Sequence, residues 1–393
     1  MFFSKVCKNQ QACMPYMPCR GRCMLYRTAY ILFGILCMDS ILSCSRAIRP
    51  ETRFALGTVC TVNLYNDGTK KLYDEIFTRI DRIEQAVSVT IPTSAVSAIN
   101  AAAGKHPVPV SRDVLTVVQA AISYAELTQG AFDPTIGPLV KLWGINTDTA
   151  HVPSSAEIDA VLPLINWRDV AVSVNSFSQQ QSNAAASASE ELAGTVFLKR
   201  AGMALDLGGI AKGYVADEII RILRARKVKR AVIDLGGNIY VFGTKADGSR
   251  WRVGVKNPVN PDSPPALMLS LDSATVVTSG VYERFFVADG IRYHHILNPF
   301  TGYPADTDVL STTIVSTNSM ASDALSTSIF LLGVENGIEL LHRMSAEGDS
   351  PNSVVHDGVD GIFITEDGIV VATKALEGRL SITHSYAGTL VFR

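Results

Sequence analysis

The chain has 393 residues, of which 47% are hydrophobic and 18% are charged, proportions typical of a globular protein with a sizeable core. The formal net charge is −2, but residues 1–44 carry five basic side chains and one acid. The remainder therefore holds 30 basic and 36 acidic groups, a net of −6, and such a mildly acidic body argues against nucleic acid as a partner.

The cysteines are distributed unevenly along the chain. Six of the seven lie in the first 44 residues, and Cys60 alone lies in the body. This distribution argues against a disulfide framework in the body, where Cys60 is expected to pack as a small apolar residue. The N-terminal cysteines lack the paired spacing of zinc ligands, so we predict no zinc site there.

The N-terminus carries a predicted export signal. An apolar run over residues 28–38 is too short to span a bilayer comfortably. It is followed by Ser43 and Cys44, a pattern that resembles a bacterial lipoprotein signal. We predict a signal over residues 1–43, lipidation of Cys44 and a tether over 44–53. A cleaved or retained anchor and a translation start at Met24 stay open.

Hydrophobic periodicity predicts both helices and strands in the body of the chain. Helices are predicted over residues 71–87, 112–128, 154–162, 210–226, 320–332 and 335–345. Strands are predicted over residues 54–64, 168–174, 195–200, 232–234, 239–243, 251–255, 267–271, 276–278, 285–288, 313–316, 362–365 and 369–373. Residues 173–194, rich in Ser, Gln, Asn and Ala, are predicted to be a mobile insertion. The pattern indicates one α+β domain over residues 54–393, with mixed or antiparallel sheets decorated with helices.

Residues 204–213 are the most informative stretch. A predicted strand ends at Asp206, and Gly208 and Gly209 turn the chain into a helix that carries Lys212. Paired glycines let main-chain N–H groups approach an anion, and the helix N-terminus adds a favourable field. The spacing matches neither a P-loop nor a dinucleotide fingerprint. The stretch predicts a phosphate-bearing ligand, with a structural hinge as the alternative.

Asp323 and Thr327 are four residues apart in a predicted helix. This spacing places a carboxylate and a hydroxyl on one face, one turn apart. Hard oxygen ligands suit a Mg²⁺ ion that keeps water or phosphate oxygens as its other ligands. In the alternative interpretation, Asp323 interacts with the helix dipole and Thr327 bonds to the preceding turn.

Adjacent His294 and His295 precede a turn rich in Pro and Gly. Because neighbours on a strand point to opposite faces, only one of them faces inward and a two-histidine zinc site is disfavoured. A histidine is a candidate general base for a hydroxyl. The chain has no G-x-S-x-G elbow, which argues against a hydrolase with an acyl intermediate.

Together, these segments resemble the ApbE family of FAD:protein FMN transferases, in the same order and across residues 54–332. The segments that carry the resemblance are Leu56-Gly57-Thr58, Ala131-Phe132-Asp133-Pro134-Thr135, Gly137-Pro138-Leu139, Trp143-Gly144, residues 206–214, residues 234–238, Ser279-Gly280 with Tyr282, His295-Ile296, Asn298-Pro299, Thr301-Gly302, and Asp323-Ala324-Leu325 with Thr327. The resemblance implies an ApbE-like, T-fold-like architecture. It also implies Mg²⁺-dependent cleavage of the FAD pyrophosphate, transfer of FMN to a Thr or Ser of an acceptor protein, and release of AMP.

The resemblance assigns roles to individual residues. It implies that Asp323, Thr327 and a main-chain oxygen near Gly209 hold the metal. It implies that Asp323 is catalytic and that the acceptor is deprotonated at His295. The residues implied to line FAD are Leu56, Asn100, Ala131, Phe132, Asp133, Asp206, Lys212, Ser279 and Leu297.

The implied partners are FAD, an acceptor flavoprotein that is a membrane redox subunit, and the membrane itself through a lipid anchor. The implied location is the periplasmic face of the bacterial inner membrane. Two alternatives stay open: a Mg²⁺-dependent FAD pyrophosphatase that gives FMN and AMP, and a flavin-binding lipoprotein without catalysis.

One departure from the family favours hydrolysis. Val87, Thr90 and Ile91 stand where the family commonly has Phe-Ser and an aromatic residue, which implies a more open wall near the adenine. Residues 367–373 partly match the family's acceptor motif, but a β-hairpin is expected there.

Overall fold

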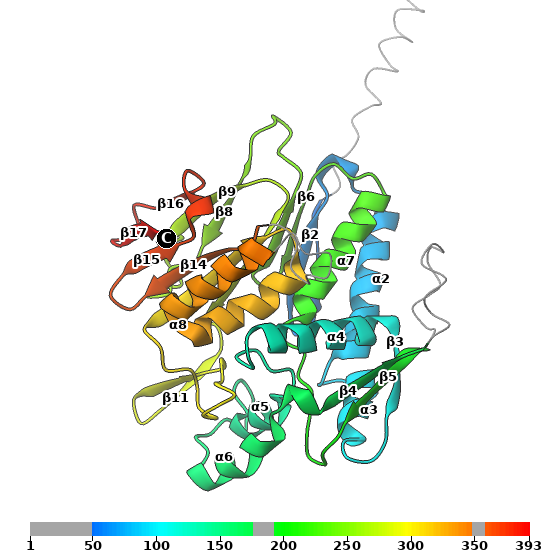
Figure 1. Ribbon diagram of the computed structural model, residues 1–393. Helices are drawn as coiled ribbons and strands as arrows, with labels where there is room; N and C mark the ends of the chain where they lie inside the picture. The colour runs from blue at the N-terminus through cyan, green and yellow to red at the C-terminus, as the bar shows by residue number, and fades with distance from the viewer. Residues whose placement is uncertain (1–48, 176–191, 348–357) are drawn as a thin grey trace, which may run out of the picture. The chain divides into compact units, whose positions relative to one another are not determined.

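A nine-stranded sheet is the largest element in the computed structural model, which describes residues 49–175, 192–347 and 358–393 (Figure 1). Neighbouring strands are antiparallel except for the parallel pair β15 and β17. In spatial order the strands are β1 (Glu51–Ala55), β2 (Thr58–Asn63), β6 (Ala231–Leu235), β7 (Asn238–Phe242), β10 (Ala274–Gly280), β13 (Val309–Ser316), β14 (Asp360–Thr365), β15 (Ile369–Ala372) and β17 (Thr389–Phe392).

Within the described residues, three smaller sheets accompany it. The first contains β16 (Leu380–Ile382), β9 (Leu267–Leu271) and β8 (Trp251–Val255). The second contains β3 (Val108–Ser111), β5 (Leu192–Leu198) and β4 (Val170–Val174), and the third is the hairpin of β11 (Phe285–Ala288) and β12 (Ile291–His294). The α-helices are α2 (Lys70–Val87), α3 (Ala95–Ala101), α4 (Arg112–Leu127), α5 (Gly137–Trp143), α6 (Ser155–Val161), α7 (Ala211–Ala225) and α8 (Ser319–Glu347). These elements confirm the predicted α+β class.

The large sheet buries both of its faces. Alternate side chains of one strand enter different cores: Ile314 of β13 belongs to the core with α2, α4, α7 and α8, whereas Val315 packs with β8 and β9. Phe363 and Ile364 of β14 divide in the same way. This is the period-two alternation of a pleated strand, and it explains why the sheet strands read as nearly continuous apolar runs.

The predicted helices are confirmed, with ends that move by a few residues. At α6, Ser154 accepts from the Glu157 N–H, and the Glu157 carboxylate accepts from the Ser154 N–H, as the predicted cap requires. Residues 369–373 were predicted as a strand. Of these, Ile369–Ala372 form β15, which pairs with β14 in a hairpin, and Thr373 follows the strand. Short elements without clear periodicity, such as α3 and α5, were not predicted.

The single strand predicted over residues 54–64 is wrong. Leu56 and Gly57 have φ angles of 55° and 68°, the two positive values of a type I′ turn, and they separate β1 from β2. Strand β1 starts at Glu51, inside the predicted tether. The signal over residues 1–43, Cys44 and residues 176–191 of the predicted insertion lie outside the described residues.

Helix α8 is long and apolar enough to span a membrane by composition. However, Gly333 adopts φ 72° and breaks it into two helical segments, and most of its apolar side chains lie in the protein core. The break agrees with the two helices predicted over residues 320–332 and 335–345. We therefore treat α8 as a core helix.

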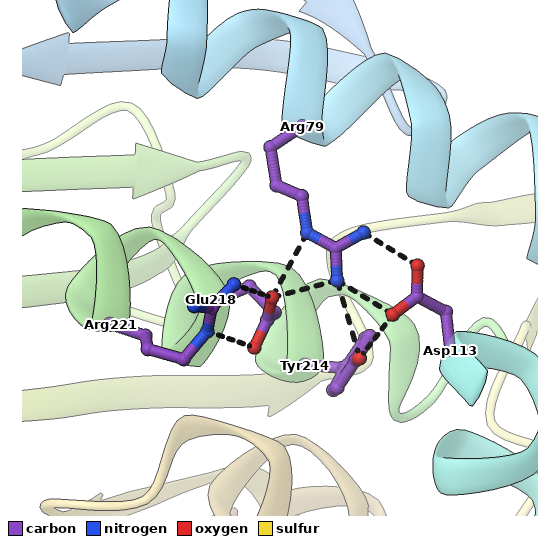
Figure 2. Close-up of polar contacts among 5 residues, drawn as sticks. All are labelled: Arg79, Asp113, Tyr214, Glu218 and Arg221. Atoms are coloured by element: carbon purple, nitrogen blue, oxygen red, sulfur yellow. Dashed lines mark hydrogen bonds and ion pairs between the residues drawn. The ribbon is translucent and has the colours of Figure 1, made fainter. Parts of the chain in front are cut away.

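A buried charge network joins α2, α4 and α7 (Figure 2). Arg79 donates to Asp113 at 2.6 Å and to Glu218 at 2.7 Å, and the Tyr214 hydroxyl donates to Asp113 at 2.6 Å. Burial by itself raises the pKa of Asp113, but hydrogen bonds from Arg79 and Tyr214 bring the pKa below its usual value. The network ties α7, the helix that follows the glycine pair, to α2 and α4.

Replacing Arg79 with alanine is expected to lower the free energy of unfolding by about 3–5 kcal/mol, because two mostly buried carboxylates lose their partner. Denaturant unfolding at pH 7 measures the loss. In the wild type, acid removes this stabilisation, since the native pKa of Asp113 lies below the unfolded value and protonation breaks the pair.

The matched control is Arg226→Ala, which removes another ion pair between α2 and α7, to Glu75, at the exposed surface. Little change is expected there because solvent screens the pair. Equal losses in the two variants would show that the buried network has no special role.

Candidate active site

Helices α7 and α8 contact each other at backbone distance. A Cβ atom at Gly213 would lie 2.2 Å from the carbonyl oxygen of Ser319, so only glycine fits in the first turn of α7. This contact brings the glycine pair next to the first turns of α8. The two stretches that the sequence marked as informative, about 110 residues apart, therefore form one site.

Asp323 is buried at this contact. Its Oδ2 accepts from the Gly213 N–H at 3.0 Å, and its Oδ1 lies 3.3 Å from Lys212 Nζ, which also donates to the Gly208 carbonyl oxygen at 3.2 Å. Ile210, which precedes α7, supplies no side-chain cap, so Asp323 caps α7 from another helix. The Gly213 N–H thus fixes one oxygen of the carboxylate, and Lys212 lies beside the other oxygen.

Three hydroxyl groups continue the site. Ser279 Oγ lies 2.9 Å from Ser326 Oγ and 3.4 Å from Thr327 Oγ1. A Cβ at Gly209 would lie 4.0 Å from Thr327 Oγ1 and 3.2 Å from the Phe132 ring. The structure therefore places Ser279, Thr327, Phe132 and Gly209 together, beside Lys212 and Asp323.

The donor set suits a hard cation. It consists of the Asp323 carboxylate, the Thr327 hydroxyl and the nearby backbone of Gly209, all oxygen donors of the kind that Mg²⁺ prefers. Within the described residues, no three His, Cys, Asp or Glu side chains converge as a metal cage. The set therefore fits a cation that takes its remaining ligands from water or phosphate.

Asp206 stabilises the turn that leads into the glycine pair. Its carboxylate accepts from the Gly208 N–H at 2.8 Å, and its own N–H donates to the Pro134 carbonyl oxygen at 2.8 Å. Burial raises the pKa of Asp206, while the Gly208 bond and the charges of Lys212 and Arg284 oppose the rise. The carboxylate holds the glycine turn and lies within the electrostatic field of both cations.

The two histidines have different environments, as predicted for neighbours on a strand. His294 is buried, with its Nε2 3.1 Å from the Ala305 carbonyl oxygen and its Nδ1 accepting from the Ile296 N–H. His295 Nδ1 lies 3.2 Å from the Arg284 carbonyl oxygen, which can only accept, so Nδ1 carries the proton. His295 Nε2 is therefore left with a lone pair.

Burial, together with the positive charge of Arg284, lowers the pKa of His295 to about 4. The imidazole is neutral at pH 7 and can accept a proton at Nε2. The positive charge of Lys212 makes a smaller contribution in the same direction, lowering the pKa of His295.

Two of the predicted FAD-lining residues use their polar atoms within the fold. Asn100 of α3 makes two hydrogen bonds with the backbone of Leu205, at 2.7 and 3.0 Å, directly before Asp206. Asp133 accepts from the backbone and hydroxyl of Thr135 and from the Trp167 N–H. Burial raises the pKa of Asp133. Both residues shape the segments next to the glycine turn.

The remaining predicted FAD-lining residues are apolar. Leu56, in the β1–β2 turn, donates its N–H to Glu84 at 2.8 Å. Ala131 is buried in the loop before Asp133, and Leu297 lies in a separate apolar cluster with Trp143. The assignment of these three residues to FAD stays a prediction.

Three residues of the site were not predicted from the sequence. Asp217 of α7 accepts from the backbone of α8, and Ser326 bonds to Ser279. The Arg284 carbonyl oxygen contacts His295 Nδ1, and the Arg284 charge lowers the pKa of His295. Asp217 lies one helical turn after Gly213, so the i,i+4 spacing is a signal that could have found it. Arg284 has no such signal, because only the β11–β12 hairpin brings it to His295.

Comparisons with known proteins give one consistent result. The model of the ApbE family matches residues 56–348. A FAD:protein FMN transferase of Treponema pallidum (strain Nichols) is 36% identical over 377 residues, 92% of this chain and 97% of the relative. One of Klebsiella pneumoniae (strain 342) is 36% identical over 326 residues, 83% and 92% of the two chains.

Solved structures agree. The ApbE protein of Thermotoga maritima is similar with a TM-score of 0.69 at 30% identity, covering 84% of this chain and 98% of the other. The flavinyl transferase ApbE of Pseudomonas stutzeri, in its apo form, has a TM-score of 0.68 at 26% identity, covering 84% and 96%.

Gly213→Ala is expected to lower the free energy of unfolding by about 1–3 kcal/mol, because the added methyl group overlaps the Ser319 carbonyl oxygen and pushes α7 from α8. Thermal unfolding measures the loss. Wild-type stability in this variant would contradict the close approach of the two helices.

Proposed function

The chain belongs to the ApbE family, and from this premise we propose that it transfers FMN from FAD to a hydroxyl group of an acceptor protein. The observation that carries the proposal is the convergence of Asp323, Thr327 and Lys212 on the Gly208-Gly209 turn. This arrangement offers a carboxylate, a hydroxyl and a cation at a helix N-terminus, the elements that a diphosphate requires.

In the proposed reaction, the acceptor oxygen attacks the FMN phosphorus of FAD. A new P–O bond forms, the P–O bond to the AMP half breaks, and AMP leaves. Charge on the nonbridging oxygens increases or shifts during such a transfer, so catalysis depends on positioning and neutralisation. Lys212 supplies a positive charge next to Asp323, and the turn before α7 supplies main-chain N–H groups.

Asp323, Thr327 and the backbone near Gly209 would hold Mg²⁺. When bound, this ion neutralises phosphate charge and orients the diphosphate for in-line attack. The fit rests on the oxygen donors that the structure brings together.

His295 accepts the proton of the acceptor hydroxyl at Nε2. The Arg284 carbonyl oxygen holds the tautomer with the proton on Nδ1, and burial keeps the ring neutral. A hydroxyl group that donates to Nε2 becomes more nucleophilic as the bond to phosphorus forms. If water takes this place, the same site hydrolyses FAD to FMN and AMP.

We also propose that the protein is anchored by a lipid on Cys44 at the periplasmic face of the inner membrane. The support is the apolar run over residues 28–38 and the small residue Ser43 before Cys44. A membrane redox subunit would then be within reach as the acceptor.

Purified protein incubated with FAD and MgCl₂, with and without bacterial membranes as the source of acceptor, tests the proposal. AMP is measured by chromatography, and covalent flavin by fluorescence of the membrane proteins after electrophoresis. We expect AMP, together with flavin fluorescence on an acceptor band. Asp323→Asn is expected to lower AMP release at least about 100-fold, because a metal ligand is lost, while FAD still binds.

The matched control is Asp262→Asn, the same change at an exposed position in the β8–β9 loop, which should behave as the wild type. AMP release without any labelled acceptor would favour the pyrophosphatase. FAD binding without AMP release would contradict both enzymatic functions and favour the flavin-binding lipoprotein.

His295→Ala is expected to slow FMN transfer while FAD affinity changes little. In the wild type, the acidic limb that His295 contributes to the pH profile of transfer should lie near pH 4, not near the usual 6.5, because burial lowers its pKa. Initial rates from pH 4 to 8 measure this. A limb near pH 6.5 that His295→Ala removes would contradict the lowered pKa of the partly buried imidazole.

A further inference from the structure

Helices α7 and α8 cap each other. On α8, Asp323 accepts from the Gly213 N–H in the first turn of α7. On α7, Asp217 accepts from the N–H groups of Ser319 and Met320 in the first turn of α8, both at 2.9 Å. Each carboxylate thus satisfies N–H groups that a helix start leaves without a partner.

The residues of the candidate site are divided between these two helices. Gly209 and Lys212 belong to the turn and first residues of α7, whereas Asp323 and Thr327 belong to α8. The distance between the two halves is therefore the distance between the helices. A shift of α8 along α7 changes every separation across the site.

The two caps differ in what else they must do. Asp323 uses one oxygen for Gly213 and presents the other to Lys212, so its interactions change when a cation binds there. Among the described residues, both oxygens of Asp217 accept only from the α8 backbone. Asp217 can therefore hold the helices in register while Asp323 changes partners.

We propose that Asp217 is a positioning residue that sets the geometry of the divalent-cation site formed by Asp323 and Thr327. The inference rests on the proposed function. Asp217 touches neither the cation nor FAD in this account and acts through the placement of α8.

Loss of Asp217 should displace α8 without detaching it. Ser319 Oγ also donates to Asn238 Oδ1 at 2.9 Å and lies 3.0 Å from Thr275 Oγ1. Asn318, the residue directly before α8, accepts from the Ala321 N–H at 2.9 Å through its Oδ1 and so caps α8 locally. The start of α8 thus stays tied to the large sheet when the Asp217 contact is weakened.

The test compares Asp217→Asn with Glu218→Gln in the full chain. Glu218 is the next residue of α7, but it pairs with Arg79 and Arg221 and not with α8 (Figure 2). Titration calorimetry with MgCl₂ alone measures cation affinity, and thermal unfolding measures stability. We expect Asp217→Asn to weaken Mg²⁺ binding about tenfold, and Glu218→Gln to lower stability with unchanged Mg²⁺ affinity.

Kinetics separate positioning from folding. In Asp217→Asn, the Mg²⁺ concentration that half-saturates AMP release should rise about tenfold, while saturating Mg²⁺ restores kcat. Asp217→Glu retains the carboxylate and should bind Mg²⁺ more tightly than Asp217→Asn. This rescue variant also provides the test if Asp217→Asn does not fold.

Three results would overturn the inference. The first is wild-type Mg²⁺ affinity in Asp217→Asn, which leaves the proposed function intact. The second is an equal loss of Mg²⁺ affinity in Glu218→Gln, which would make the effect one of stability. The third is a wild-type protein that binds no Mg²⁺, which would remove the proposed metal site itself.

Discussion

The close approach of α7 and α8 at Gly213 is the constraint on which the site depends. A side chain there would collide with the Ser319 carbonyl oxygen, so the two helix starts can meet only because this residue is glycine. The contact brings the Asp323 carboxylate onto the Gly213 N–H and next to Lys212. Groups suited to a phosphate, at the start of α7, and groups suited to a cation, on α8, therefore lie side by side.

The surrounding fold holds this contact from two sides. The Arg79 network ties α7 to α2 and α4 with buried ion pairs, and the hydroxyl of Ser319 ties α8 to the large sheet. Buried charges of this kind are costly to separate, because each lost partner leaves an unpaired charge away from water. They make the arrangement of the helices stiff, which suits a reaction that depends on positioning.

The electrostatics of the site separate two tasks. Lys212 and the start of α7 provide positive potential where a diphosphate would lie. The same positive surroundings, with burial, keep His295 unprotonated, so a cationic site contains a neutral base. Phosphate binding and proton removal are compatible because nearby positive charge stabilises a phosphate anion and disfavours the protonated imidazole.

Local patterns along the chain determined the helices, most strands and the turn chemistry, since these depend on near neighbours. They also marked the glycine pair, the Asp323–Thr327 spacing and the two histidines, because each of these features is defined by residue types at neighbouring positions or by the face that a short spacing shares. The β1–β2 turn was missed because Leu56 is an apolar residue of the kind a strand contains, although Gly57 beside it is a turn former.

What only the tertiary structure decided is which of these features meet. The pairing of Asp217 with the start of α8 depends on packing between elements about 100 residues apart in sequence, and that of Arg284 with His295 depends on the β11–β12 hairpin. Likewise, the fold commits Asn100 and Asp133 to backbone groups that no local pattern identifies. Residue types and spacings specify local geometry, whereas contacts at long sequence separation arise only when the cores around the large sheet are packed.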